Sequence, residues 1–254
     1  SLNTFLTDKT PGKKTNIVAH SMGGLVARYC FEKVTGCAGK IGKIVTAGTP
    51  HQGLIEAYQL WEGGQFDADP ALKFMEEIML HATNLPYLTN KDIVQNRIPG
   101  VKDLLPTFDY ILGKPYSSLS SQAKNQVLES LQPFGENFVS QTTPLSGNSQ
   151  DTYSGFTTIG LSSLDKALGL WKDGKPDIFS TAMGDGTVLK SSAEITGSSL
   201  NKNYALEHQD YLRTTQSLTD ITATLGLTPT SIVTGSDTVN SVLAFIIHSP
   251  ATIS

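Results

Sequence analysis

Ser21 is the residue whose surroundings best suit a nucleophile. It lies in the run Ala19-His20-Ser21-Met22-Gly23, with small residues two positions before and two positions after it. A sharp turn from a strand into a helix holds the serine in a strained conformation, which requires such small neighbours. The run fits the pattern Gly-x-Ser-x-Gly with alanine in place of the first glycine. We predict that Ser21 is a nucleophile and that the backbone N–H of Met22 is one oxyanion donor.

A serine hydroxyl also needs a base to take its proton and a third group to orient that base. The sequence has five histidines. His20 is adjacent to Ser21 and is expected to pack beside the turn, whereas His51 follows a strand near the site but precedes the predicted acid in the chain. His81 falls in a predicted insertion and His248 in a terminal segment. We therefore predict that His208, just before the last helix, is the base.

Asp185 is the best candidate for the orienting acid. It stands between Gly184 and Gly186, and such a loop lets a carboxylate turn inward at the end of a strand. Asp177 is the alternative, but its setting after Lys175 and Pro176 suits an exposed turn better. We predict Asp185, with Asp177 as the next residue to test.

The elements that position Ser21 follow from changes in hydrophobic period. Residues 15–20 and 41–47 are short apolar runs with turn residues at their ends, as expected for strands of a parallel sheet. Between them, apolar residues from Leu25 to Val34 recur at helical spacing, and Gly36 can take the left-handed conformation that ends a helix. A strand, helix, strand order with short links predicts a parallel sheet with a right-handed crossover.

The remaining chain divides into further units. Residues 1–53 are predicted to be core, 54–154 a helical cap insertion, 155–227 core again, and 228–254 the start of a β-rich segment. In the insertion, Asp69 and Pro70 are typical of a helix start, and residues 140–154 form a polar stretch. Sheet structure is expected to resume at residues 156–160, and the last helix to stop at Gly226.

Composition restricts the partners. A net charge of -4 gives no basic surplus for nucleic acid or anionic lipid, and no apolar stretch reaches the length of a membrane-spanning helix. Charged residues make up 17%, fewer than usual, which favours a secreted or cell-surface protein. Cys30 and Cys37 form either a local disulfide or two ordinary thiols. CxxC and HExxH patterns are absent, so we predict no metal and no cofactor.

The motifs together resemble bacterial triacylglycerol lipases and the lecithin:cholesterol acyltransferase-like group of α/β-hydrolases. The resemblance rests on Ala-His-Ser-Met-Gly-Gly, Gly-Thr-Pro-His-Gln-Gly, Leu-Leu-Pro and Gly-Asp-Gly-Thr-Val, followed by the late histidine. The order Ser21, Asp185, His208 is that of α/β-hydrolases. The resemblance implies an α/β-hydrolase fold, a mostly parallel sheet with flanking helices. The strands that precede the serine turn in such enzymes, and a second oxyanion donor, are expected to lie outside these 254 residues.

The predicted function is hydrolysis of carboxylic esters through an acyl-enzyme. The cap offers apolar side chains that would cover an acyl chain, which favours a lipid ester substrate and transient contact with a lipid interface. The predicted substrate-binding residues are His20, Leu54, Leu104 and Leu105. Acyl transfer to an alcohol is the nearest alternative, and a non-catalytic module with this fold is the alternative from another class.

Overall fold

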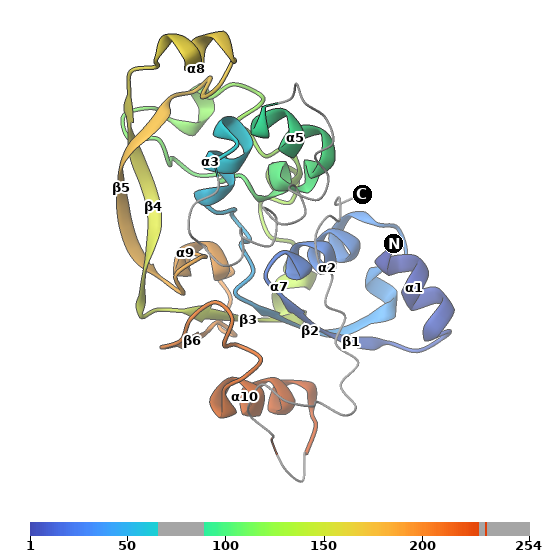
Figure 1. Ribbon diagram of the computed structural model, residues 1–254. Helices are drawn as coiled ribbons and strands as arrows, with labels where there is room; N and C mark the ends of the chain where they lie inside the picture. Colours follow the sequence, from blue (N-terminus) through green and yellow to red (C-terminus); the bar gives the residue numbers. More distant parts are fainter. Residues whose placement is uncertain (66–88, 229–231, 233–254) are drawn as a thin grey trace.

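The computed structural model describes residues 1–65, 89–228 and 232. Its central element is a parallel sheet of four strands in the order β1-β2-β3-β6 (Figure 1). The predicted α/β class with a parallel sheet is confirmed. The helix predicted from Asp69 and the β-rich segment predicted after Pro229 lie outside the described residues. The strands are β1 (Thr15–His20), β2 (Ile41–Ala47), β3 (Thr142–Gly147) and β6 (Lys202–Tyr204).

The first three core elements match the predicted order. Strands β1 and β2 have the predicted bounds and pair in parallel, with α2 (Met22–Lys33) between them. Gly36 has the expected positive φ of 77°, but the helix ends three residues earlier, at Lys33. Helix α1 (Leu2–Lys9) precedes this unit, and the short 3-10 helix η1 (Ala38–Lys40) leads into β2.

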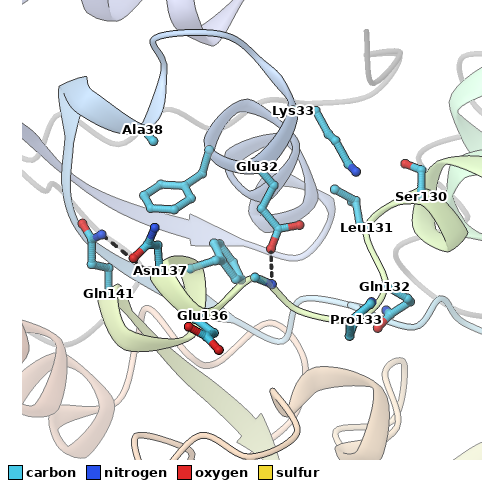
Figure 2. Close-up of a pocket in the computed structure, with 13 residues that line it drawn as sticks. Glu32, Lys33, Ala38, Ser130, Leu131, Gln132, Pro133, Glu136, Asn137 and Gln141 are labelled. Atoms are coloured by element: carbon cyan, nitrogen blue, oxygen red, sulfur yellow. Dashed lines mark hydrogen bonds between the residues drawn. The ribbon is translucent and has the colours of Figure 1, made fainter.

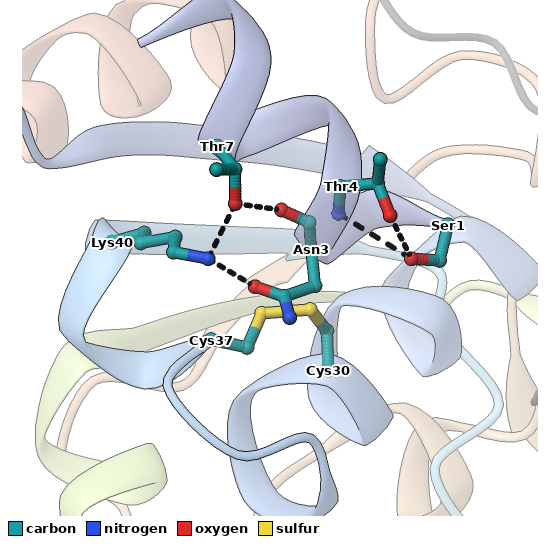
Figure 3. Close-up of a disulfide and its surroundings, with 7 residues drawn as sticks. All are labelled: Ser1, Asn3, Thr4, Thr7, Cys30, Cys37 and Lys40. Atoms are coloured by element: carbon teal, nitrogen blue, oxygen red, sulfur yellow. Dashed lines mark hydrogen bonds between the residues drawn. A yellow bond between two sulfur atoms is a disulfide. The ribbon is translucent and has the colours of Figure 1, made fainter. Parts of the chain in front are cut away.

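Cys30 and Cys37 form a disulfide that closes the turn after α2. Figure 3 shows α1 lying over this disulfide. The Lys40 ammonium fastens α1 there, because it donates to Asn3 Oδ1 and Thr7 Oγ1, both at 2.6 Å. Of the two alternatives that the sequence leaves open for these cysteines, the structure has the disulfide.

Helices cover both faces of the sheet. Figure 1 shows α2 and α7 (Glu136–Gln141) on one side and α10 (Thr215–Leu225) on the other. Neighbouring residues of β2 alternate between the two sides, as strand geometry requires. Ile44 packs with Phe31 and Phe138, whereas Val45 packs with Leu145 and Ile221. The predicted last helix is confirmed, since α10 ends at Gly226 with a φ of 72°.

A group of elements, which we call the cap, stands on the α2 side of the sheet and shares a hydrophobic cluster with Met22 and Leu25 of α2 (Figure 1). Its helices are α3 (Glu56–Gly63), α5 (Asn90–Arg97) and α6 (Gln126–Ser130), with the 3-10 helices η2 (Pro99–Leu104) and η3 (Tyr116–Ser118). A long antiparallel hairpin of β4 (Gln150–Ile159) and β5 (Lys175–Gly184) runs along it, with α8 (Ser163–Ala167) at its far end. The short helix α9 (Lys190–Ala193) follows the hairpin.

Two predictions about the middle of the chain are wrong. The strand predicted at residues 156–160 is present as part of β4, but its assignment to the core is wrong, because β4 pairs with β5 in a separate sheet and Phe156 packs on Tyr58 of the cap at 5.1 Å. The returning core strand is β3, inside the polar stretch predicted as insertion. Every residue of β3 is buried although several are polar, and Ser146 satisfies its hydroxyl by donating to Asn203 Oδ1 at 2.7 Å.

Within the described residues, no helix is both long enough and apolar enough to span a membrane.

Candidate active site

Ser21 forms the whole of the turn between β1 and α2. Its φ of 53° and ψ of -132° are unusual for a residue with a Cβ atom. The backbone N–H of Ser21 donates to the carbonyl of Ala47 at 2.8 Å, which fixes the turn against the end of β2. The Ser21 hydroxyl makes no capping bond to α2, so the helix does not engage the oxygen atom.

The two glycines after Met22 differ in how much room their positions leave for a side chain. A Cβ at Gly23 would lie 3.9 Å from Cβ of Ala19, an ordinary contact that explains why alanine fits two positions before the serine. Gly24 is more constrained, because a Cβ there would overlap the side chain of Thr49. Gly24 therefore lets α2 pack directly against the loop that follows β2, a requirement that the five-residue pattern does not contain.

Asp185 and His208, predicted from separate parts of the sequence, are hydrogen-bonded to each other. His208 Nδ1 lies 2.9 Å from Asp185 Oδ2, and the backbone N–H of His208 donates to the Asp185 carbonyl at 2.9 Å. The acceptor is a carboxylate, so Nδ1 carries the proton and Nε2 of the neutral ring is left as an acceptor. This tautomer is the one that a general base facing a serine needs.

The carboxylate of Asp185 is fully buried and has partners on both oxygens. Oδ1 accepts from the backbone N–H groups of Thr187 at 3.0 Å and Val188 at 2.7 Å, and Oδ2 also accepts from the Tyr211 hydroxyl at 3.0 Å. Burial by itself raises the pKa of Asp185. The hydrogen bond and charge of His208 and the two backbone N–H groups lower the pKa by more than burial raises it, so it lies below the usual value for a carboxyl group. Asp185 is therefore ionised and rigidly held.

Gly48, the first residue after β2, connects this pair to the Ser21 turn. A Cβ at Gly48 would lie 2.7 Å from Tyr211 Cε2, 2.9 Å from Asp185 Oδ2 and 3.0 Å from His208 Cε1. Its chain neighbour Ala47 accepts the hydrogen bond from Ser21. The end of β2 thus has the Ser21 turn on one side and the Asp185–His208 pair on the other.

The other predicted site residues have different surroundings. Asp177 lies exposed on β5, away from the acid position. Met22 is the first residue of α2, where the helix dipole favours an anion. Leu54, Leu104 and Leu105 belong to the cap cluster and are 7%, 9% and 0% exposed, so they are core residues and contact with a substrate stays a prediction for them.

Two contacts of the site were not predicted. Tyr211 follows His208 by three residues, but nothing in the sequence indicates that its hydroxyl turns to Asp185. His20 was expected to pack beside the turn and to contact substrate; in the structure its ring lies against His208, with ring centroids 4.7 Å apart.

His51 lies outside the site, in the loop after β2, and its side chain is fully buried. Its Nε2 is 3.3 Å from Thr46 Oγ1, and its ring packs edge-on against Phe134 and Phe138. The guanidinium of Arg28, also buried, stacks over Phe134 at 4.0 Å and donates to the His51 carbonyl. Burial, and secondarily the charge of Arg28, hold the pKa of His51 well below its usual value of 6.5.

This burial makes the fold sensitive to acid. Below pH 6.5 the unfolded chain takes up a proton on His51 that the folded chain does not, so the free energy of unfolding falls as the pH falls. We expect the loss from this one group to reach about 1.4 kcal/mol per pH unit. His51→Gln should reduce the slope between pH 6 and 5 by about that amount in urea titrations, and equal slopes for the two proteins would contradict the prediction.

A surface groove of about 730 Å³ lies at the other end of α2, lined by Phe31–Lys33 of the helix and by residues of the 130–141 segment (Figure 2). The backbone N–H of Gly135 donates there to Glu32 Oε1 at 3.0 Å. Because Phe31 lies ten residues after Ser21 along α2, the groove is separated from Ser21 by about 15 Å of helix. It includes none of the predicted site residues.

Two comparisons with known proteins give a match. Residues 2–61, from α1 to α3 and including the Ser21 turn, match the family described as PGAP1-like alpha/beta domain. With the parallel sheet and flanking helices, this match is consistent with the predicted α/β-hydrolase fold. Among solved structures, the chain is similar to the mature form of the Bacillus licheniformis lipase BlEst2, with 16% identity and a TM-score of 0.41. The similarity covers 82% of this chain and 64% of the lipase, less than two thirds of its length. None of the curated proteins compared with the chain matches it.

Proposed function

We propose that this protein is a serine hydrolase of carboxylic esters, with Ser21 as nucleophile, His208 as base and Asp185 as the acid that orients the base. The observation that carries the proposal is the buried Asp185–His208 hydrogen bond of 2.9 Å, in contact with His20, the residue that precedes a serine with a φ of 53°. The strained backbone of Ser21 costs free energy, and such strain is common at active sites. An oriented histidine at the same end of the sheet is what a serine nucleophile needs, so the two features together fit a catalytic role.

In the proposed reaction, Ser21 Oγ attacks the ester carbonyl carbon while His208 Nε2 takes the hydroxyl proton. The carbonyl oxygen becomes an oxyanion, which the Met22 N–H stabilises. The intermediate collapses, the bond to the alcohol oxygen breaks, and His208 gives its proton to the departing alcohol. Water then attacks the acyl-enzyme, His208 accepts its proton, and the carboxylic acid leaves as the proton returns to Ser21. An alcohol in place of water would give acyl transfer by the same steps.

The proposed substrate is a lipid-like ester, and the protein is proposed to be secreted or at the cell surface. The apolar cap over the α2 side of the sheet supports the first of these proposals, because acyl chains are bound by apolar side chains. The Cys30–Cys37 disulfide supports the second, since disulfides persist in oxidising compartments. We also propose that the protein makes transient contact with a lipid interface.

Labelling with a fluorophosphonate tests the proposal directly. This reagent bonds covalently to a serine that a neighbouring base has activated, so the folded protein should be labelled and mass spectrometry should locate the adduct on Ser21. The same chain unfolded in urea is the control and should remain unlabelled. A folded protein that takes up no label at Ser21 and hydrolyses no p-nitrophenyl ester would favour the alternative of a non-catalytic module.

A further inference from the structure

The nucleophile and the base come from opposite edges of the described sheet. Ser21 follows β1, and His208 follows β6, while β2 and β3 lie between these strands. Because neighbouring strands are about 4.8 Å apart, the chain after β6 must cross about 14 Å of sheet edge to reach the Ser21 turn. The loop from Ala205 to Arg213 makes this crossing. Asp185 holds His208 through its ring and its backbone N–H, and a further contact with the end of β1 would fix its position relative to Ser21.

His20 supplies such a contact. Its Nε2 lies 2.7 Å from the main-chain carbonyl oxygen of His208, although the two residues are 188 positions apart in the sequence. The two imidazole rings are also packed together, with centroids 4.7 Å apart and planes tilted by 46°. His20 is the last residue of β1 and precedes Ser21 directly, so this contact joins the strand that carries the nucleophile to the loop that carries the base.

We propose that His20 is a positioning residue that holds the backbone of His208 at the distance from Ser21 that proton transfer requires. This inference rests on the proposed ester hydrolase. Asp185 accepts hydrogen bonds from the ring Nδ1–H and from the backbone N–H of His208, and His20 donates to the backbone carbonyl of the same residue. With hydrogen bonds on its ring, its backbone N–H and its backbone carbonyl, His208 has little freedom to swing away from the Ser21 hydroxyl.

The protonation state of His20 suits this role. A carbonyl oxygen only accepts, so His20 Nε2 must donate and the neutral ring has its proton there. Burial, and then the adjacent His208, lower the pKa of His20 from 6.5 to about 4, against smaller raising effects of the His208 carbonyl and Asp185, while Arg213 lowers it slightly. His20 therefore stays neutral near pH 7 and does not oppose the positive charge that His208 acquires during the reaction.

Two substitutions separate the hydrogen bond from the ring packing. His20→Phe keeps a planar ring and removes the donor, whereas His20→Gln removes the ring and keeps an amide donor near the position of Nε2. We expect His20→Phe to lower kcat for a p-nitrophenyl ester by about 100-fold with little change in KM, since a displacement of about 1 Å has effects of this size. His20→Gln should recover most of that loss. Gln209→Ala, next to His208 and exposed, is the control and should keep the wild-type kcat.

A second measurement makes the test independent of activity. The Nδ1 proton of His208, hydrogen-bonded to Asp185, should give a downfield proton resonance, and His20→Phe should broaden or shift it while Gln209→Ala leaves it unchanged. If the wild-type protein neither labels nor turns over esters, the proposed function fails, but this resonance still decides whether His20 holds His208. Wild-type kcat together with an unchanged resonance in His20→Phe would overturn the inference, and so would equal losses in the Phe and Gln variants.

Discussion

Replacing Ser21 with alanine is expected to lower kcat for ester hydrolysis by about 10⁶-fold. Alanine keeps the Cβ atom and the turn geometry but removes the only oxygen that can form the acyl-enzyme. The change leaves the fold intact, because the Ser21 hydroxyl makes no capping bond to α2. Initial rates with p-nitrophenyl esters measure the loss. Ser140→Ala, an exposed serine of α7, is the matched control and should retain full activity.

A double variant sharpens this prediction. Ser21 and His208 act as one unit, so adding His208→Ala to Ser21→Ala should cause almost no further loss. If the two losses multiplied instead, the residues would be acting independently and the assignment of His208 as the base for Ser21 would be wrong. Activity that survives in Ser21→Ala would place the nucleophile elsewhere.

Asp185→Asn is expected to lower kcat by about 10⁴-fold while the protein remains folded. The asparagine oxygen can stay where Oδ1 accepts from Thr187 and Val188, so the amide nitrogen would take the place of Oδ2. That nitrogen donates to His208 Nδ1, which moves the imidazole proton to Nε2. A ring with its proton on Nε2 cannot accept one from Ser21.

The matched control for this change is Asp177→Asn, which alters the same functional group on exposed β5 and should have no effect on kcat. Circular dichroism and a thermal melt show whether each variant is folded. Normal hydrolysis by a folded Asp185→Asn protein would move the acid role away from Asp185, and a large loss in Asp177→Asn would move it to that residue.

The sequence alone predicted the elements whose information is local. The bounds of β1 and β2 and the end of α10 at Gly226 follow from hydrophobic period and glycine, both of which act over a few residues. The types and chain order of Ser21, Asp185 and His208 also come from local motifs. Their catalytic roles stay predictions, but the Asp185–His208 hydrogen bond shows that two of these motifs meet in space.

Tertiary structure decided the features that depend on distant partners. β3 is a core strand despite its polar residues, because neighbours on both sides bury it and satisfy hydroxyls such as that of Ser146. Leu54, Leu104 and Leu105 are core residues because they pack in one cluster with residues of α2, α3 and α5, and an apolar type does not distinguish a core from a binding surface. Tyr211 meets Asp185, and His20 meets His208, only because the folded sheet brings them together. Such contacts depend on how strands and loops cross one another, and a short pattern along the chain does not contain that information.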